Sequence, residues 1–339
     1  MTLWAVLPGG IDDPAAPSGG NRYDRTVLSL LPDVHELAIP GDWPSPGTAA
    51  RTALHKALAD IPDMSTVLID GLVGCGVPEI LEPHAARLRL ILLIHLPLSD
   101  ETGLDPAAAD ALRAREKQAV HLATTVVATS QAAADRVKTM HDLVRVEVAP
   151  PGVDPAPLTE PEPSGRRLLC VAAVTPRKGQ DLLVGALQND LAGLDWECRF
   201  AGALIKPVPY EDPRLRFEGA LHGAALDDAY GQADLFVLPS RAETYGMVVT
   251  EALARGIPVL ATAVGGVPEA LGTAPDGTRP GLLIPPDDRP ALAAALRSWL
   301  TGAALRDRLR AAARARRETL PSWPGTASAL SAICEGDPR

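Results

Sequence analysis

The sequence predicts an α/β protein of two doubly wound, Rossmann-like domains with a ligand-binding cleft between them. Its 339 residues suffice for about two domains, each with its own core. Short apolar runs alternate with helical patterns along the chain, as expected for parallel sheets joined by crossover helices. The alternation is interrupted at residues 149–165, where six prolines exclude a helix and indicate a semi-rigid linker.

The predicted elements follow this alternation in both halves. In the first half we expect strands at 3–7, 34–39, 66–69, 90–95, 125–128 and 144–148, and helices at 49–59, 106–121 and 132–141. In the second half we expect strands at 167–171, 197–201, 215–217, 235–238, 258–262 and 281–284, and helices at 179–187, 224–232 and 246–255. A final helical region is expected at 290–318, with a break near Thr301-Gly302. The predicted domains are 1–152 and 166–305, joined by the linker 153–165. A C-terminal helix and tail, residues 306–339, are expected to pack back toward the first domain, with Trp323 in the tail.

Composition and charge restrict the class of protein. Hydrophobic residues make up 46% of the chain and charged residues 22%, which is ordinary for a soluble globular protein. The net charge is −10, and residues 1–160 hold 12 basic against 21 acidic residues. This acidic first half argues against nucleic acid as a partner and against peripheral contact with an anionic membrane.

Targeting signals and cysteine usage indicate a cytoplasmic protein. The longest apolar run, residues 88–98, is too short to span a bilayer, and the first residues lack the pattern of a signal peptide. The cysteines are widely spaced and form no C-x-x-C pair, so we interpret them as small core residues in a reducing compartment. They are Cys75, Cys170, Cys198 and Cys334.

The most informative segment, residues 240–269, has Glu243 in a loop and Glu251 inside an otherwise apolar helix. Gly246 lies between them at the predicted helix start, where it leaves the first backbone amides open to an anion. Two carboxylates and a helix N-terminus at one strand end can hold sugar and ribose hydroxyls beside a diphosphate. The alternative is that Glu251 forms an i,i+4 pair with Arg255 on an exposed helix face.

A second segment places two cations just beyond a strand end. Arg177 and Lys178 follow the strand 167–171 and precede a helix that begins at Gly179. Arginine can bind phosphate oxygens through two parallel hydrogen bonds, and lysine supplies a compact charge. Cations at a helix N-terminus oppose the helix dipole, so an anionic ligand explains them better than the alternative of two solvated side chains.

Together with three further segments, these two resemble the family-4 glycosyltransferases of the two-domain GT-B fold, and the resemblance covers nearly the whole chain. One further segment is Ala-Pro-Pro-Gly-Val-Asp at 149–154. The others are Ala-Asp-Leu-Phe-Val-Leu-Pro-Ser at 233–240 and Gly-Leu-Leu-Ile-Pro-Pro-Asp-Asp at 281–288. Five segments in the family's order are a specific signal, whereas each alone is weak.

The resemblance implies a retaining transfer of a hexose from a nucleotide diphosphate sugar, with UDP-glucose as the expected donor and with no metal or other cofactor. It implies that Glu243 contacts the donor sugar, that Glu251 binds the ribose, and that Lys178 and Arg177 neutralise the diphosphate. The family's Gly-Arg is replaced by Ala-Ala at 172–173, so Arg177 is the candidate to substitute for the missing arginine. The remaining donor-binding residues are Thr244, Tyr245, Gly246, Met247 and Val248.

The resemblance also assigns residues in the first domain. The glycine-rich segment 16–25 follows the first strand and opens a helix, and in the family a Gly-Gly loop at this position lines the cleft. A histidine at the end of the fourth strand faces the donor sugar there, which gives His95 a catalytic role beside Glu243, Lys178 and Arg177. The alternatives are a flexible surface loop and a hydrogen-bonded core histidine. The remaining residues are Gly19 and Gly20 on the donor side, and Asn21, Tyr23 and Asp70 on the acceptor side.

Three other functions stay open beside a transferase with a soluble small-molecule acceptor. A GT-B-like nucleotide-sugar 2-epimerase would need acid/base carboxylates and histidines in the first domain. A nucleotide-sugar-binding protein without catalysis is compatible with the missing arginine. A Rossmann dehydrogenase is disfavoured, because the glycines of residues 71–76 do not have the G-x-G-x-x-G spacing. The sequence leaves the oligomeric state undecided.

Overall fold

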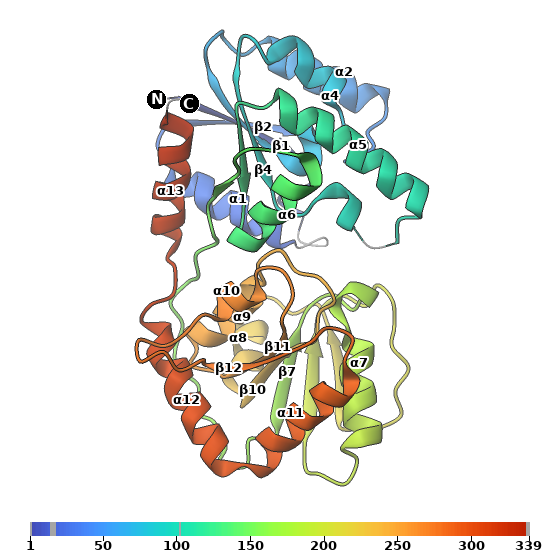
Figure 1. The fold of residues 1–339 in the computed structure, drawn as a ribbon, viewed down its shortest axis with the longest axis vertical. Coiled ribbons are helices and arrows are strands. Elements are labelled where there is room, and N and C mark those ends of the chain that lie inside the picture. Colours follow the sequence, from blue (N-terminus) through green and yellow to red (C-terminus); the bar gives the residue numbers. More distant parts are fainter. Residues whose placement is uncertain (1, 14–17, 102, 337–339) are drawn as a thin grey trace. The chain divides into compact units, whose positions relative to one another are not determined.

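The computed structural model describes residues 2–13, 18–101 and 103–336 (Figure 1). The chain forms two compact units. Unit 1 consists of Met1–Gly152 and Pro321–Arg339, and unit 2 consists of Val153–Leu320. Ala16 and Pro17 of the predicted glycine-rich segment and residues 337–339 of the predicted tail lie outside the described residues.

Unit 1 is built on a parallel sheet with the strand order β2-β1-β3-β4-β5-β6. The predicted strands are confirmed, except that the last is shorter at its start. It begins at Glu147 and leaves Val144 92% exposed. The strands are β1 (Leu3–Pro8), β2 (Val34–Ile39), β3 (Thr66–Asp70), β4 (Arg89–Ile94), β5 (Thr125–Ala128) and β6 (Glu147–Val148).

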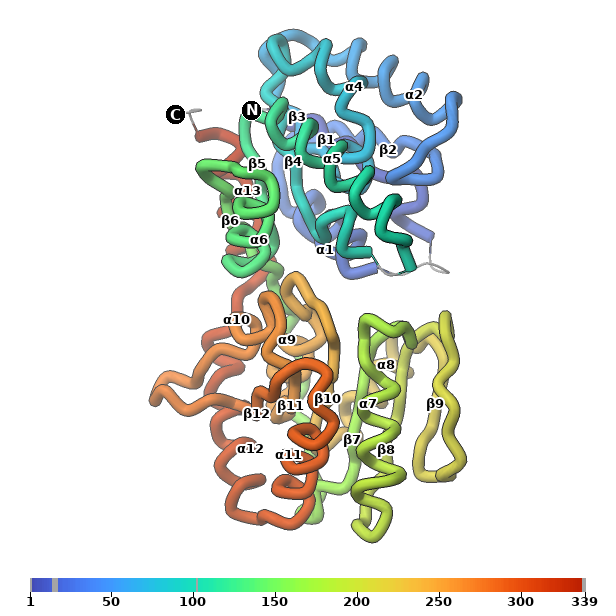
Figure 2. Tube along the Cα trace, turned by 45° about the vertical axis from the view of Figure 1, so that its right-hand side comes forward, coloured from blue at the N-terminus to red at the C-terminus, as the bar shows by residue number. Residues whose placement is uncertain are grey.

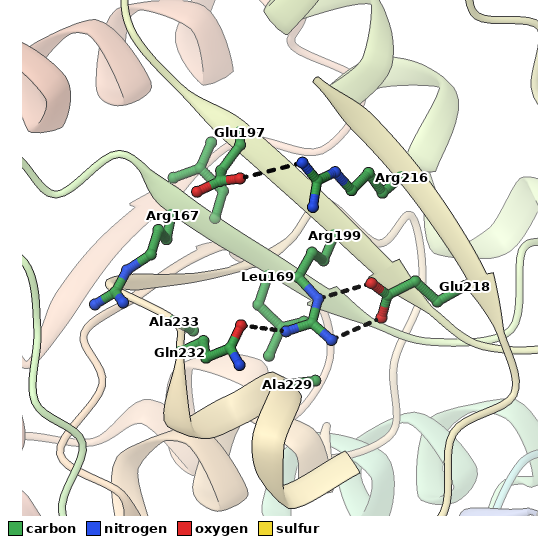
Figure 3. Close-up of a pocket in the computed structure, with 10 residues that line it drawn as sticks. Arg167, Leu169, Glu197, Arg199, Arg216, Glu218, Ala229, Gln232 and Ala233 are labelled. Atoms are coloured by element: carbon green, nitrogen blue, oxygen red, sulfur yellow. Dashed lines mark hydrogen bonds and ion pairs between the residues drawn. The ribbon is translucent and has the colours of Figure 1, made fainter. Parts of the chain in front are cut away.

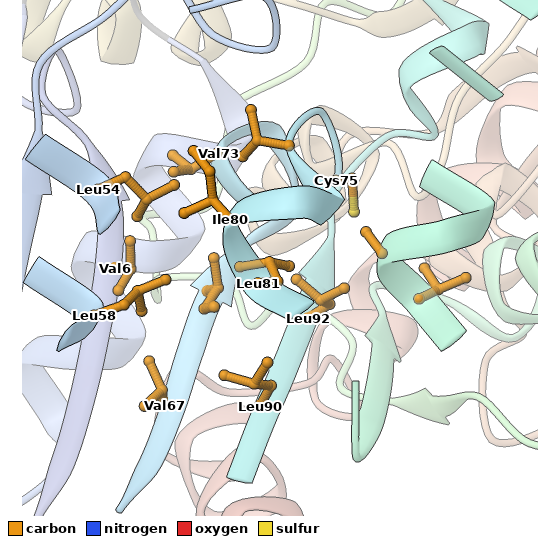
Figure 4. Close-up of a cluster of buried hydrophobic side chains, with 14 of the residues drawn as sticks. Val6, Leu54, Leu58, Val67, Val73, Cys75, Ile80, Leu81, Leu90 and Leu92 are labelled. Carbon is orange, nitrogen blue, oxygen red and sulfur yellow. The ribbon is translucent and has the colours of Figure 1, made fainter. Parts of the chain in front are cut away.

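The core of unit 1 follows from the two-residue period of its strands. On one face of the sheet, Val67, Leu90 and Leu92 pack against the helices α2, α3, α4 and α5 (Figure 4). The helices are α1 (Gly19–Leu30), α2 (Thr48–Ala59), α3 (Gly71–Gly74), α4 (Pro78–Leu81), α5 (Pro106–Leu122), α6 (Gln131–His141) and α13 (Trp323–Glu335), with the 3₁₀ turns η1 (Glu82–His84) and η2 (Leu98–Asp100).

Unit 2 is a second parallel sheet, with the strand order β12-β11-β10-β7-β8-β9 (Figure 2). Its predicted strands are confirmed to within two residues at either end. The strands are β7 (Arg167–Val171), β8 (Glu197–Ala201), β9 (Leu215–Gly219), β10 (Leu235–Leu238), β11 (Val259–Thr262) and β12 (Gly281–Ile284).

Both faces of the unit 2 sheet are covered, which explains its nearly continuous apolar strands. Leu168 and Cys170 pack with α7 and α11 on one face, and Leu169 packs with α8, α9 and α10 on the other. The helices are α7 (Gln180–Gly185), α8 (Gly223–Gly231), α9 (Met247–Ala254), α10 (Val267–Leu271), α11 (Arg289–Thr301) and α12 (Ala303–Arg317), with the 3₁₀ turn η3 (Pro176–Lys178) and the π-helical turn η4 (Ala186–Asp190).

The segment expected to be a tail around Trp323 is the helix α13, which packs against α1 within unit 1. Ser322 caps it by accepting a hydrogen bond from the backbone N–H of Gly325 at 3.2 Å, a start signal that the sequence carried. Trp323 is buried and meets Tyr23 edge-on, with 6.0 Å between the ring centroids. The Thr326 hydroxyl donates to the carbonyl of Pro150 at 2.8 Å, which joins the helix to the last residues before unit 2.

No helix among the described residues is both long and apolar enough to cross a membrane.

Candidate active site

The strand order of unit 2 brings the two predicted donor-site segments to the same place. β7 lies between β8, which follows it in the chain, and β10, which is formed later. The chain direction across the sheet therefore reverses between β7 and β10, where parallel α/β sheets bind their ligands beyond the carboxyl ends of the strands. Lys178 ends the turn η3 after β7, and Glu243 lies in the loop after β10.

Lys178 and Glu243 form an ion pair at this position. The Lys178 ammonium donates to Oε1 of Glu243 at 2.5 Å, and the Ser240 hydroxyl donates to the same oxygen at 2.8 Å. Nη1 of Arg177 lies 3.8 Å from Oε2 of Glu243. The side chains of Glu243 and Lys178 are only 7% and 17% exposed, so the charges compensate each other in a largely dry site. The sequence predicted both residues but not their pairing.

Backbone contacts hold these two segments together. The backbone N–H of Arg241 donates to the carbonyl of Arg177 at 2.7 Å, and Nη1 of Arg177 donates to the carbonyl of Ala242 at 3.2 Å. A third segment approaches at Gly265, where a Cβ atom would lie 1.7 Å from the carbonyl oxygen of Glu243. Only glycine fits this contact, so Gly265 packs directly against the backbone of the Glu243 loop.

Glu251 is a buried residue of α9, so the alternative of an exposed ion pair on this helix is wrong. Its Oε2 accepts a 2.9 Å hydrogen bond from the hydroxyl of Tyr230, which is also buried. The Arg255 guanidinium covers the Tyr230 ring, 4.4 Å from its centroid, and pairs with Asp227. The Tyr230 hydroxyl therefore satisfies one oxygen of a carboxylate that lies in an otherwise apolar helix.

The start of α9 lies between the two glutamates. Gly246 caps the helix in the left-handed conformation, with φ at 89°, and Met247 and Val248 form its first turn. The first amides of a helix have no acceptor within the helix, so this end can donate to an anion. Tyr245 is 4% exposed, and burial raises its pKa to about 12. The Tyr245 ring is part of the core, so this residue can offer chiefly its backbone to a ligand, and Thr244 is half-buried.

In unit 1, a second cluster forms where β1, β3 and β4 end. Asp70 ends β3 and caps α3, accepting from the backbone N–H of Leu72 at 2.7 Å. His95 directly follows β4, and its Nε2 lies 2.8 Å from Oδ1 of Asp24. Side-chain atoms of Asp24, Asp70 and His95 lie within 4.8 Å of one another, so their charges interact directly. Asp24 was not predicted, although its position four residues after Gly20 on α1 was a usable signal.

The charge of Asp24 shifts the pKa values of both Asp70 and His95. Burial, reinforced by the charge of Asp24, raises the pKa of Asp70 to about 7. Burial by itself lowers the pKa of His95, but the charge and hydrogen bond of Asp24 and the charge of Asp70 outweigh it and raise the value to about 9. The imidazole therefore carries a positive charge at neutral pH.

The other predicted residues of unit 1 lie on α1, the helix that carries Asp24. Gly19 and Gly20 are the first two residues of α1, and the backbone N–H of Asn21 donates to the Ser18 hydroxyl at 3.0 Å, which caps the helix. Tyr23 is 1% exposed, and its hydroxyl donates to the carbonyl of Ala149 at 3.0 Å. Burial raises the pKa of the Tyr23 hydroxyl, so Tyr23 is a neutral core residue, and its ring packs edge-on against His95.

The predicted site residues line neither of two cavities that lie among the described residues. The first, of about 200 Å³, lies in unit 2 beside the amino-terminal parts of β7 and β8 (Figure 3). Its charged residues compensate one another, as in the pair between Arg199 and Glu218 at 2.8 Å. The second, of about 520 Å³, lies in unit 1 and is lined by the starts of β4, β5 and β6 and by the end of α13. Both are remote from the strand ends where ligands bind.

Comparison with known proteins shows which family the chain resembles. Residues 165–302 match the family described as "Glycosyl transferases group 1". The D-inositol 3-phosphate glycosyltransferase of Jonesia denitrificans is 31% identical over 269 residues, which are 68% of this chain and 62% of that protein. The chain spans 47% to 62% of the length of the first such relatives.

Solved structures share the fold. The sucrose-phosphate synthase of Thermosynechococcus elongatus superposes with a TM-score of 0.72 at 20% identity, over 98% of both chains. HepE of Anabaena, solved in complex with UDP-glucose, gives 0.70 at 17% identity over 98% of this chain and 99% of its own. These likenesses in sequence and fold identify the chain as a family-4-like member of the group 1 glycosyltransferases, with the GT-B fold.

Proposed function

We propose that this chain transfers a hexose from a nucleotide diphosphate sugar to an acceptor hydroxyl, with retention at the anomeric carbon and without a metal ion. The observation that carries the proposal is the ion pair between Lys178 and Glu243, 2.5 Å apart where the chain direction reverses between β7 and β10. It provides a cation for a diphosphate and a carboxylate for sugar hydroxyls, beside the open end of α9.

The charges of the site suit cleavage of the bond between sugar and diphosphate. Negative charge grows on the leaving diphosphate, where Lys178, Arg177 and the first amides of α9 can stabilise it. Such preorganised donors are typically worth about 10²–10³ in rate each. Glu243 accepts from the donor sugar and fixes Lys178 in place, while Glu251 accepts from the ribose. In a front-face reaction the leaving phosphate accepts the acceptor's proton, so no separate carboxylate nucleophile is required.

Two of the related proteins suggest substrates. UDP-glucose is the donor we propose, because HepE of Anabaena is solved in complex with it. For the acceptor we propose a soluble polyol phosphate, as the name of the D-inositol 3-phosphate glycosyltransferase suggests. The four buried, free cysteines support action in the reducing cytoplasm.

The test is a transfer assay with a panel of nucleotide sugars, each with and without D-inositol 3-phosphate. Acceptor-dependent release of UDP and a new α-glycoside in the NMR spectrum are expected. Glu243→Ala should abolish transfer, whereas the exposed Lys206→Ala serves as a matched surface control. Full activity of Glu243→Ala rules out the proposed donor site.

One observation favours a second function, a nucleotide-sugar 2-epimerase. This reaction needs acid and base groups in unit 1, and Asp24, Asp70 and His95 supply two carboxylates and an imidazole there. Incubation with an N-acetylhexosamine nucleotide in the absence of any acceptor distinguishes the two. Formation of the 2-epimer supports the epimerase, and an unchanged sugar supports the transferase.

A further inference from the structure

The imidazole of His95 is held by one face of α1. Gly20, Tyr23 and Asp24 are spaced i, i+3 and i+4, so their side chains share a face of that helix. Asp24 binds Nε2 at 2.8 Å, and the Tyr23 ring lies edge-on to the imidazole with 5.2 Å between centroids. A Cβ on Gly20 would come within 3.1 Å of the His95 ring, so glycine permits this close packing.

We propose that Asp24 is a positioning residue that fixes His95 as a hydrogen-bond donor toward the ligand. Asp24 occupies Nε2, so Nδ1 is the ring nitrogen that His95 can offer. A doubly protonated ring offers it as an N–H donor, whereas a neutral ring bonded to Asp24 through Nε2–H offers it as an acceptor. The identity of the ligand atom, a sugar hydroxyl or a phosphate oxygen, rests on the proposed function. The protonation state of the His95 imidazole does not depend on it.

Burial and charge around the ring support this assignment. Asp24 is 3% exposed, and its carboxylate faces Asp70 as well as His95. A buried carboxylate needs a compensating charge, so Asp24 favours the positively charged form of the adjacent imidazole. The titratable groups that face His95 are Asp24 and Tyr23 from α1 and Asp70 from the end of β3. Both acids favour the imidazolium, and Tyr23 stays neutral.

The first test is an NMR titration of the imidazole signals in the unliganded protein, with His95 assigned from the signal missing in His95→Gln. In the wild type, His95 should titrate near pH 9. In Asp24→Asn, which keeps the size of the side chain but removes its charge, proton binding should weaken at least about tenfold. Asp110→Asn, an exposed aspartate on α5, is the matched control and should leave the titration unchanged.

The wild-type titration decides the outcome even if Asp24→Asn fails to fold. The proposal is overturned if His95 of the wild type titrates near the ordinary histidine value of about 6.5. It is also overturned if His95 titrates at the same pH in Asp24→Asn as in the wild type. These measurements need no substrate, so they remain valid if the chain transfers no sugar. Where transfer is observed, kcat should fall at high pH as the His95 imidazole loses its proton. In Asp24→Asn this fall should begin at least about one pH unit lower than in the wild type.

Discussion

The Tyr230 hydroxyl and Oε2 of Glu251 are joined by a 2.9 Å hydrogen bond in the core of unit 2. The bond connects α8 to α9, the helix that begins at the candidate diphosphate site. It uses one lone pair of the carboxylate and fixes the direction of the other oxygen. Tyr230 thereby orients a residue proposed to bind the donor, without a place in that site itself.

Tyr230→Phe is therefore expected to weaken donor binding more than it slows the chemistry. The change leaves a buried carboxylate oxygen without its donor, which costs about 1–3 kcal/mol. We expect the KM for the nucleotide sugar to rise roughly tenfold with little change in kcat, measured by initial rates. Tyr210→Phe removes the hydroxyl of a tyrosine that is 44% exposed and should leave both parameters unaltered. A fall in kcat at constant KM contradicts this role of Glu251.

Lys178 and Glu243 should behave as one unit in a double-mutant cycle. Removing either partner leaves the other charge poorly compensated, so Lys178→Met and Glu243→Gln should each reduce kcat/KM by about 10²-fold or more. The double variant should lose much less than the product of the two effects. Independent, multiplicative losses contradict a functional pair and indicate two separate contacts with the donor.

The raised pKa of Asp70 should make the protein less stable as the pH rises, whereas aspartates usually have the opposite effect. Its folded pKa of about 7 lies above the unfolded value, so the native state binds the extra proton and stability falls as pH rises from about 4 to 7. Asp70→Asn keeps an oxygen for the Leu72 N–H and removes the buried charge. It should raise the free energy of unfolding at pH 7.5 relative to the wild type, with a much smaller gain at pH 4.5. Urea unfolding of both proteins at pH 4.5 and pH 7.5 measures the difference in their free energies of unfolding. The same difference at both pH values would contradict the prediction.

Glu116 and His141 form a second buried pair in unit 1. Oε2 of Glu116 lies 2.9 Å from Nε2 of His141, and Oε1 accepts from the backbone N–H of Leu98 at 3.2 Å. Glu116→Ala should lower the free energy of unfolding by about 3 kcal/mol, because it leaves buried polar groups without partners. Asp110→Ala breaks an exposed pair with Arg113 and should cost under about 1 kcal/mol. Nucleotide binding by the folded Glu116→Ala protein should be retained.

The sheets were predictable because a parallel strand buried on both faces leaves a strong local signal. Leu235–Leu238 has an apolar residue at every position, and the prediction of this strand was confirmed to the residue. The helix at Trp323 was missed, although its Ser-x-Pro start was present, because most of its stabilising contacts are with residues far away in the sequence, such as Tyr23.

The candidate site was predictable in composition but not in its pairings. Lys178 and Glu243 are 65 positions apart, and their contact depends on β10 pairing with β7 rather than with β9. The contact between Asp24 and His95 was not predicted for the same reason, because only the adjacency of β1, β3 and β4 brings α1 to His95. Strand order is set by the whole domain, so it cannot be read from any one segment.

The contact of α13 with α1 has a consequence for how the protein is made. Residues Val153–Leu320 form unit 2 as one continuous stretch, whereas unit 1 needs segments from both sides of it. The backbone at Gly152 packs so closely on Trp323 that a Cβ there would lie 2.2 Å from its nitrogen. During translation, unit 1 begins to emerge from the ribosome first but can complete its core only after the whole of unit 2 has been synthesised.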